Sequence, residues 1–556
     1  RMEAMSTRRL SLSLSLSVCV LLLCVLLPAA AAVASQHITV DTTYGPVIGK
    51  VEDDVVVFRG IPFAAPPVGK LRFHTPVPPQ PWTKPKECFL SLKICPQLDV
   101  YNKFIGTEDC LYLDMYVPKS HFDNKNLAPL PIMAWIFGGG WAMGDAYEFG
   151  LYDGKNLARR NNVIVMAMNY RLNPAGFLAL EELVEEDGSV GNQGLKDQRF
   201  ALQWLQKNAN AFRGDPQQVT LFGESAGAFS ICFHLASPGS KGLFRAAILE
   251  SGSCDTPQFW RPTVDAFAFG RDYLRLVGCN HTSSDKILDC LASMTTKQMM
   301  HYESIPKNFQ WEFKPQLWPI MPWAATIDGS PNGLVDTPTA MIKEGTFNRV
   351  PVIAGTNRDE GSIFIPVMPF IIPGEKFPFT ESSLFRFVAY FFNDTIASQI
   401  MELYPLHEFP SQDHRASRIL RDYFFVCSER RTLFAMSDQN GMPDTFMYQF
   451  VFRPFPFVGD YHAAELDYVF DHSWPLLIPL GGEYAKMGAI MGHYWTNFAK
   501  NLDPNVGSSP VPSGTTNWPR FNSTVEEAMV LDYPTYPEIG LASSRCDFWD
   551  MIMKEL

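Results

Sequence analysis

Short apolar runs recur along this chain, and each one ends in a loop of small or polar residues. Such runs occupy 131–136, 218–222, 350–355 and 445–452. They are predicted to be buried strands, because they are too short for typical helices and are bounded by turn-forming residues. Directly after the second run, the apolar stretch 226–233 is predicted to begin a buried helix. Strands that alternate with helices place the chain in the α/β class.

The segment 223–227 has the pattern Gly-x-Ser-x-Gly, with Ser225 at its centre. It lies between the predicted strand 218–222 and the predicted helix 226–233, which is the context of a nucleophilic serine held on a sharp turn. Small residues flank the serine because the turn is too tight for larger side chains. Taken alone, the same pattern also fits an ordinary glycine-rich turn, so a catalytic interpretation requires partners elsewhere in the chain.

A serine hydroxyl needs a base that accepts its proton and a third group that orients the base. The predicted strand 350–355 leads into a loop with two adjacent carboxylates, Asp359 and Glu360, and Glu360 is the preferred candidate for the acid. His462 follows a glycine-containing loop after the strand 445–452 and is the candidate base. The order serine, acid, histidine is the order known for enzymes with this serine turn.

Attack on an ester carbonyl also needs donors for the oxygen that becomes negative. The predicted strand 131–136 leads into three consecutive glycines, whose bare backbone lets N–H groups approach a substrate closely. Gly139 and Gly140, together with Ala226 just after the serine, are the candidate donors. The alternative for an isolated glycine run is a flexible loop.

Four further motifs accompany these stretches. They are FRGIPFA at 58–64, EDCLYL at 108–113, NYRL at 169–172 and GNQGLKDQ at 191–198. With them, the chain resembles the type-B carboxylesterase and cholinesterase family over most of its sequence. The resemblance implies an α/β-hydrolase fold, with a large and mostly parallel central sheet flanked by helices. It also implies carboxylic ester hydrolysis by the triad Ser225, Glu360 and His462, and so favours Glu360 over Asp359.

Nearby residues are assigned supporting roles by the same resemblance. Glu224 stands where the family has a glutamate, and either supports the charged His462 or only holds the turn. Ser251 resembles a serine that supports the acid and the histidine, although a polar strand end is the alternative. Phe137 occupies a place where many carboxylesterases have histidine. Cholinesterases bind choline on a tryptophan in the first disulfide loop.

That loop contains only Tyr101 and Phe104 as aromatic residues here, which disfavours a choline site. A single tyrosine in such a loop is more often a packing residue than a cation platform.

The cysteines indicate an oxidising compartment. The family resemblance implies three disulfides, namely Cys95 with Cys110, Cys279 with Cys290, and Cys427 with Cys546. Of the remaining cysteines outside the N-terminal segment, Cys232 is expected to be a buried free thiol, Cys254 has no assigned partner, and Cys88 competes with Cys95 for Cys110. Three sequons are candidate glycosylation sites: Asn280, Asn393 and Asn522.

Residues 1–34 are predicted to be a signal peptide, since two arginines precede an apolar stretch that ends in small residues. An uncleaved membrane anchor is the alternative. Residues 35–556 are predicted to form a single domain, because no linker, repeat or low-complexity run divides them. The expected location is extracellular, with the endoplasmic-reticulum lumen as the alternative because the chain ends in Glu-Leu, like some retention signals.

Composition limits the partners. The net charge of −12, without a basic aromatic patch, excludes nucleic acid as an expected partner, and removal of the arginine-rich segment 1–34 makes the chain more acidic. No histidine group has metal-ligand spacing, so neither a metal nor a cofactor is expected. The predicted partner is a small-molecule ester, and no membrane span is expected after signal removal. A catalytically silent binding protein on the same fold is the competing functional class.

Overall fold

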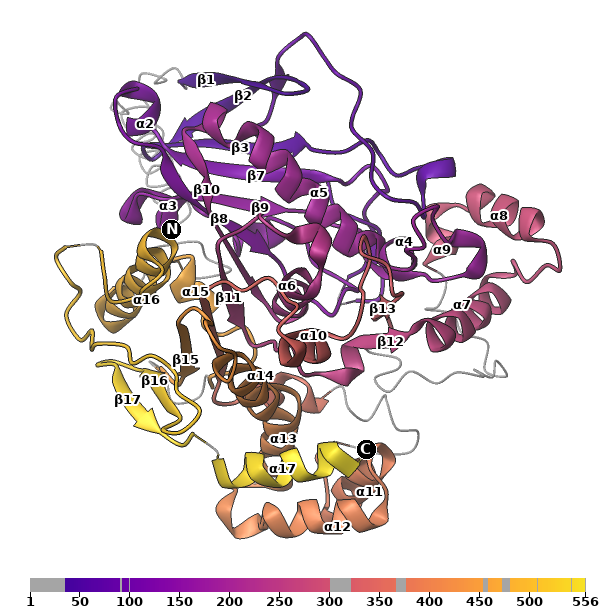
Figure 1. The fold of residues 1–556 in the computed structure, drawn as a ribbon, viewed down its shortest axis with the longest axis vertical. Helices are drawn as coiled ribbons and strands as arrows, with labels where there is room; N and C mark the ends of the chain where they lie inside the picture. Colours follow the sequence, from indigo (N-terminus) through magenta and orange to yellow (C-terminus); the bar gives the residue numbers. More distant parts are fainter. Residues whose placement is uncertain are drawn as a thin grey trace, which may run out of the picture. The chain divides into compact units, whose positions relative to one another are not determined.

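The apolar runs predicted as strands all lie in one large sheet, shown in the computed structural model of Figure 1. Its strand order is β1-β2-β3-β7-β9-β8-β10-β11-β14-β15-β16-β17, with β4 paired to β2. The strands are β1 (His37–Thr42), β2 (Gly45–Glu52), β3 (Val55–Pro62), β4 (Lys86–Glu87), β7 (Tyr112–Pro118), β8 (Leu130–Ile136), β9 (Ile164–Met168), β10 (Gly214–Glu224), β11 (Ala246–Glu250), β14 (Val352–Asn357), β15 (Thr445–Phe450), β16 (Glu527–Leu531) and β17 (Tyr536–Ile539).

The structure describes most of the chain from residue 36 onward. The described ranges are 36–90, 93–99, 101–300, 322–366, 377–453, 459–472, 481–507, 509–541 and 543–555. The predicted signal peptide at 1–34 lies outside these residues. From Ile38 onward the chain forms one compact unit.

The sheet is parallel at its centre and antiparallel toward both edges. Strands β9, β8, β10, β11, β14, β15 and β16 pair in parallel, whereas β2, β3 and β7 form antiparallel pairs and β17 returns antiparallel to β16. This arrangement confirms the predicted α/β class and the mostly parallel central sheet. After β8 the chain adds β9 on one side and β10 on the other, so the order reverses there, and ligands commonly bind at such a reversal.

Helices connect the strands and cover the sheet. They are α2 (Ser120–Asp123), α3 (Lys155–Asn161), α4 (Asn173–Phe177), α5 (Gln193–Asn208), α6 (Ala226–Ala236), α7 (Thr263–Val277), α8 (Ser284–Ser293), α9 (Thr296–Met299), α10 (Pro338–Glu344), α11 (Glu381–Phe391), α12 (Asp394–Leu403), α13 (Gln412–Arg421), α14 (Cys427–Ser437), α15 (Leu466–Val469), α16 (Gly482–Asn501) and α17 (Ser543–Glu555). Two small sheets pair β5 (Gln97–Leu98) with β6 (Phe104–Ile105), and β12 (Trp260–Pro262) with β13 (Ala325–Ile327).

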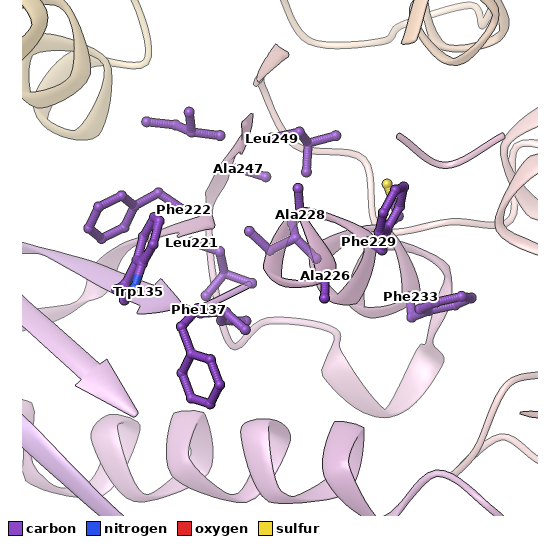
Figure 2. Packing of buried hydrophobic residues seen from close by; sticks show 14 of the residues in the cluster. Trp135, Phe137, Leu221, Phe222, Ala226, Ala228, Phe229, Phe233, Ala247 and Leu249 are labelled. Carbon is purple, nitrogen blue, oxygen red and sulfur yellow. The ribbon is translucent and has the colours of Figure 1, made fainter. Parts of the chain in front are cut away.

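Alternating side chains of β10 pack on different neighbours. The Phe222 ring lies 4.8 Å from that of Trp135 on β8, and Trp135 meets Phe470 edge-on at 5.1 Å. Figure 2 shows Leu221 beside the helix that carries Ala226, whereas Phe222 lies with Trp135. Because neighbouring residues of a strand point to opposite faces, both faces are buried in the second half of β10, from Val219 onward. This burial explains why the apolar residues of the strand gather there.

Strand register brings the candidate site together at one edge of the sheet. Gly223 on β10 lies opposite Ile136 on β8, and Glu224 lies opposite Glu250 on β11. Glu250 in turn lies opposite Gly355 on β14. Since these strands are parallel, their carboxyl ends meet, and the loops that follow them share one region.

Candidate active site

Ser225 stands at the turn between β10 and α6. Its backbone has φ 54° and ψ −121°, a conformation rarely adopted by residues with a side chain. The turn is crowded by β8, since a Cβ on Gly227 would lie 1.9 Å from the carbonyl oxygen of Ile136 and one on Gly223 would lie 2.6 Å from it. Only glycine fits these two positions. The N–H of Ser225 donates to the carbonyl of Glu250 at 2.8 Å, which ties the turn to β11.

Glu360 and His462 come together from two different loops. The Nδ1 atom of His462 lies 2.5 Å from Oε2 of Glu360, whose side chain is fully buried. The other oxygen, Oε1, accepts hydrogen bonds from the Ser251 hydroxyl and from the N–H of Asn357, both at 2.6 Å. These contacts on both oxygens fix the carboxylate and allow it to hold a proton on Nδ1 of the imidazole.

The adjacent carboxylate, Asp359, binds different partners. It forms ion pairs with Arg453 and, at 3.9 Å, with Arg418. Its N–H donates to the carbonyl of Asp460 at 3.0 Å. Of the two carboxylates that the sequence places side by side, Glu360 is therefore the one bonded to the histidine.

A second carboxylate, Glu224, lies near the other nitrogen of the His462 ring. Its Oε1 is 3.0 Å from Nε2, but the geometry does not make a hydrogen bond, and Nε2 has no hydrogen-bond partner among the described residues. Burial lowers the pKa of His462, whereas the charges of Glu224 and Glu360 raise it, and the outcome is a pKa well above the ordinary 6.5. The ring is thus held between two negative groups, with Nε2 available for proton exchange.

The glycine run after β8 lies against the serine turn. A Cβ on Gly138 would come 3.1 Å from the Cβ of Ser225. Gly139 and Gly140 have φ of 91° and 62°, which favour glycine, and neither N–H donates to another described residue. The N–H of Ala226 belongs to the first turn of α6, where it has no acceptor within the helix. The N–H groups of Gly139, Gly140 and Ala226 thus have no hydrogen-bond acceptor among the described residues, and they flank Gly138 and Ser225 in the chain.

Aromatic rings shield the histidine. The rings of Phe364 and Phe425 lie 5.2 Å and 4.9 Å from the ring of His462. Sequence analysis selected neither of them. Phe364 is recognisable only by its closeness to the acid in the chain, and Phe425 comes from a distant segment. Phe137, which directly precedes the glycine run, is buried, and its ring stacks on that of Tyr170 with the ring centres 4.3 Å apart. This packing anchors the start of the glycine run.

Three more buried glutamates lie close to the site: Glu250, Glu429 and Glu465, each 0% exposed. Burial is the main cause that raises their pKa, well above the ordinary value for Glu250 and Glu429 and to about 8 for Glu465. Glu250 accepts a hydrogen bond from Trp495 and Glu465 accepts one from Asn357, but neither oxygen of Glu429 has a partner among the described residues. Burial therefore favours the neutral form of each of these carboxyl groups. None of the three was predicted from the sequence, because an isolated glutamate carries no motif.

A cavity of about 850 Å³ opens next to Asp359 and Tyr461, the chain neighbours of Glu360 and His462. Its described lining combines carboxylates and apolar side chains with four arginines: Arg358, Arg418, Arg453 and Arg545. The volume lies within the range that holds small organic ligands.

The sequence of this chain matches a known protein family. The sequence profile of the Carboxylesterase family matches residues 36–549. The chain belongs to the carboxylesterase family. It is 33% identical to acetylcholinesterase 1 of Caenorhabditis elegans, over 90% of this chain and 84% of that protein. It is also 33% identical to para-nitrobenzyl esterase of Bacillus subtilis, over 89% of this chain and 95% of that protein.

A solved structure of a PNB esterase is similar with a TM-score of 0.74 and 30% identity, covering 92% of this chain and 100% of the other. The family resemblance and the fold inferred from sequence are thereby confirmed. As a member of the carboxylesterase family with these relatives, the chain is a carboxylic ester hydrolase.

The cysteines of this chain form four disulfides within the described residues. Three have the pairing that the family resemblance implied: Cys95–Cys110, Cys279–Cys290 and Cys427–Cys546. The fourth, Cys232–Cys254, shows that the prediction of a free thiol at Cys232 was wrong. The two Cα atoms are 5.1 Å apart because the segment after β11 folds back against α6. Cys88 is buried and free, so it does not compete for Cys110.

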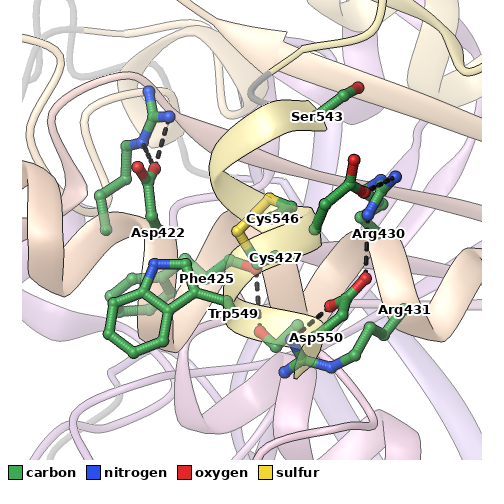
Figure 3. The surroundings of a disulfide bond; sticks show 12 residues. Asp422, Phe425, Cys427, Arg430, Arg431, Ser543, Cys546, Trp549 and Asp550 are labelled. Carbon is green, nitrogen blue, oxygen red and sulfur yellow. Dashed lines mark hydrogen bonds and ion pairs between the residues drawn. A yellow bond between two sulfur atoms is a disulfide. The ribbon is translucent and has the colours of Figure 1, made fainter. Parts of the chain in front are cut away.

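The Cys427–Cys546 disulfide joins α14 to the C-terminal helix α17 (Figure 3). Beside it, Arg430 and Arg431 of α14 bind opposite oxygens of Asp550 on α17, at 2.9 and 3.0 Å. The covalent link and these ion pairs fasten the last helix to the element that also carries Glu429.

Tyr101 and the sequon asparagines, also singled out from the sequence, lie at the surface. Tyr101, in the first disulfide loop, is 78% exposed and does not form a buried platform. The three sequon asparagines are exposed: Asn280, Asn393 and Asn522.

Among the described residues, no cluster of three or more histidine, cysteine or acidic side chains is arranged to hold a metal. No helix of the described ranges has the length and apolar character needed to cross a bilayer.

Proposed function

We propose that this chain hydrolyses esters through an acyl-enzyme, with Ser225 as nucleophile, His462 as base and Glu360 as the acid that orients the base. The observation that carries the proposal is the bonding of the His462 ring. Its Nδ1 lies 2.5 Å from Glu360, while its Nε2 is unbonded on the side of Glu224, the residue before Ser225. This is the division of roles that a serine hydrolase requires of its histidine.

In the first half of the reaction, Nε2 takes the proton of the Ser225 hydroxyl while Oγ attacks the ester carbonyl carbon. The carbonyl oxygen becomes negative and accepts hydrogen bonds from the N–H groups of Gly139, Gly140 and Ala226. The bond to the alcohol oxygen then breaks, and His462 gives its proton to the leaving alcohol. In the second half, water loses a proton to the same nitrogen and attacks the acyl carbon. The bond from that carbon to Oγ then breaks, His462 returns the proton to Oγ of Ser225, and the acid is released.

Glu224 is proposed to support this cycle. When Nε2 is protonated, the imidazolium stands between Glu224 at 3.0 Å and Glu360 at 2.5 Å. A negative group on each side favours the charged ring, which forms in both halves of the reaction. The other role open to Glu224, that of holding the turn only, predicts no effect on the titration of His462.

We propose neutral short-to-medium acyl esters as the substrate class. The loop closed by Cys95 and Cys110 has no tryptophan, and its Tyr101 is exposed to solvent. A cation is held strongly only on a desolvated aromatic face, so this loop favours uncharged alcohol groups.

The test compares nitrophenyl or naphthyl esters with choline esters of the same acyl group. We expect higher kcat/KM for the neutral esters, because an enzyme without a cation site has no preference for choline as the alcohol group. The acyl group is kept the same in each comparison, since each methylene of the acyl chain changes the activation barrier by ~1–3 kcal/mol. A clear preference for the choline ester that is lost in Tyr101→Ala would reverse this assignment. It would favour the second candidate, a cholinesterase, which the similarity to acetylcholinesterase 1 of Caenorhabditis elegans supports.

Labelling of the serine tests the hydrolase directly against the catalytically silent binding protein that the sequence left open. Reaction of the wild-type chain with diisopropyl fluorophosphate separates the two, because only an activated serine is phosphorylated. Covalent labelling at Ser225 is expected, and the complete lack of labelling together with the lack of ester turnover would support the silent protein.

We further propose that the chain is secreted as a glycoprotein. Four disulfides and three exposed sequon asparagines support passage through an oxidising secretory route. Treatment of the expressed protein with a glycosidase, followed by mass spectrometry of the sequon peptides, tests this. Retention in the endoplasmic-reticulum lumen would instead leave the folded enzyme inside the cell.

A further inference from the structure

The disulfide that sequence analysis did not foresee lies beside the two serines of the site. Cys232 is on α6, the helix that begins after Ser225, and Cys254 follows Ser251 by three residues. Both cysteines are buried, with exposed fractions of 1% and 3%. The bond therefore links the helix of the proposed nucleophile to the segment whose serine donates to the proposed acid.

Packing along one face of α6 explains the position of this bond. A Cβ on Gly252 would lie 2.7 Å from the Cβ of Ala228 and 2.8 Å from the carbonyl oxygen of Ser225, so the segment is pressed against the first turn of α6. Ala228 and Cys232 are four residues apart and share a helix face. The segment after β11 thus runs along this face, with Gly252 on Ala228 and Cys254 on Cys232.

Cys254 is also fixed by two other helices. Its N–H donates to the hydroxyl of Thr432 on α14 at 3.1 Å, and its carbonyl accepts from the hydroxyl of Thr339 on α10 at 2.9 Å. The disulfide is the only one of these three links that is covalent, and the only one that leads directly to the nucleophile helix.

The two segments that the disulfide joins each contain a serine with an unfavourable backbone conformation. Ser225 has φ 54° and Ser251 has φ 53°, and each persists only because its surroundings hold it. They follow Glu224 and Glu250, which lie opposite each other on neighbouring parallel strands. The Ser251 hydroxyl donates to Oε1 of Glu360 at 2.6 Å, so a shift of Ser251 would pass to the carboxylate and its histidine.

We propose that the Cys232–Cys254 disulfide is a positioning element for catalysis, which keeps Ser251 bonded to Glu360 and in register with the Ser225 turn. This inference rests on the proposed triad. The reacting atoms do not touch the disulfide, and its effect is on the geometry of the acid and the histidine. Misplacement of catalytic groups by about 1 Å costs roughly 100-fold in rate.

The test removes the disulfide in the full chain with the pair Cys232→Ala and Cys254→Ala. The matched control is the pair Cys279→Ala and Cys290→Ala, whose bond closes a loop between α7 and α8. Both pairs are expected to lower the thermal midpoint. At a temperature well below both midpoints, the first pair is expected to lower kcat about 10- to 100-fold with little change in KM, and the control is expected to keep wild-type kcat.

A cycle with Ser251→Ala identifies the route of the effect. If the disulfide acts through Ser251, adding Ser251→Ala to the disulfide-free chain lowers kcat far less than it does in the wild-type chain. Wild-type kcat without the Cys232–Cys254 bond, an equal loss in the control pair, or fully additive losses would each overturn the proposal. Failure of the proposed function itself is recognised separately, since the wild-type chain would then not turn over esters.

If the alanine pair does not fold, Thr339→Val and Thr432→Val replace it. These changes release Cys254 from α10 and α14 but leave the disulfide intact. The proposal expects kcat to stay within about threefold of wild type, because the covalent link still holds the segment. A loss as large as that of Ser251→Ala would overturn it.

Discussion

The Glu224 carboxylate lies 3.0 Å from Nε2 of His462, on the nitrogen that Glu360 does not hold. Glu224 is also the residue directly before Ser225 in the chain, so the end of β10 provides both the candidate nucleophile and a carboxylate beside the proposed base. Burial lowers the pKa of His462, and Glu224 together with Glu360 outweighs it, so the pKa is raised above its ordinary value.

Replacing Glu224 should therefore change the pH dependence of the reaction. His462 accepts a proton only when neutral, so kcat/KM falls as pH drops through its pKa. Glu224→Gln removes one of the two charges that raise this pKa, and the acidic limb of the profile is expected to move to lower pH. The pH profile of kcat/KM for a neutral ester measures this shift. Glu87→Gln, which removes an exposed carboxylate, is the control. An unchanged limb would assign Glu224 to the turn alone.

Ser225→Ala should abolish hydrolysis and leave the fold intact. The hydroxyl is required for the covalent step, and the loss in kcat is expected to reach at least about 10⁴-fold. The thermal midpoint should stay close to wild type, since little packing is lost. Turnover and organophosphate labelling are measured together, and an alanine variant with wild-type turnover would remove Ser225 from its proposed role.

Comparison of two adjacent carboxylates tests the acid. Glu360→Gln is expected to lower kcat by about 10³–10⁴-fold, because the amide cannot hold the imidazole in the same way. Asp359→Asn should lower it far less, since Asp359 pairs with Arg453 and Arg418. The two variants differ only in which carboxylate is neutralised, and a larger defect in the Asp359 variant would exchange their assignments.

Glu429 should make the protein less stable as pH rises. Its pKa is about 4.5 when exposed and is raised in the fold by burial and by Glu360, so the folded state retains a proton that the unfolded state loses. The contribution of Glu429 to the free energy of unfolding is fully present below pH 4.5. Between pH 4.5 and the raised pKa, this contribution falls by about 1.4 kcal/mol per pH unit. Glu429→Gln removes this slope.

The thermal midpoint between pH 5 and pH 8 measures the effect of Glu429→Gln. The variant is expected to lose less stability across this range than the wild type, while Glu402→Gln, at an exposed position of α12, keeps the wild-type dependence. If the stability of the Glu429 variant had the same pH dependence as that of the wild type, the carboxyl of Glu429 in the wild-type chain would be ionised or paired in the folded state.

The local parts of the site were predictable because a few neighbouring residues define them. The Ser225 turn needs glycine on both sides, and the Gly139–Gly140 run needs positive φ, so each leaves a readable pattern in the chain. The strands β8, β14 and β15 and the buried second half of β10 were predictable for a similar reason, since burial on both faces selects mostly apolar residues in a short run.

The sequence by itself determined the α/β class, the family and the identity of the candidate serine, acid and histidine. Only the tertiary structure decided which atoms meet: the Glu224 contact with His462, the Cys232–Cys254 bond and the burial of Glu429. Their partners come from segments far apart in the chain, and pairing, burial and pKa depend on distances in space. Strand register and helix packing set these distances, and no local pattern encodes them.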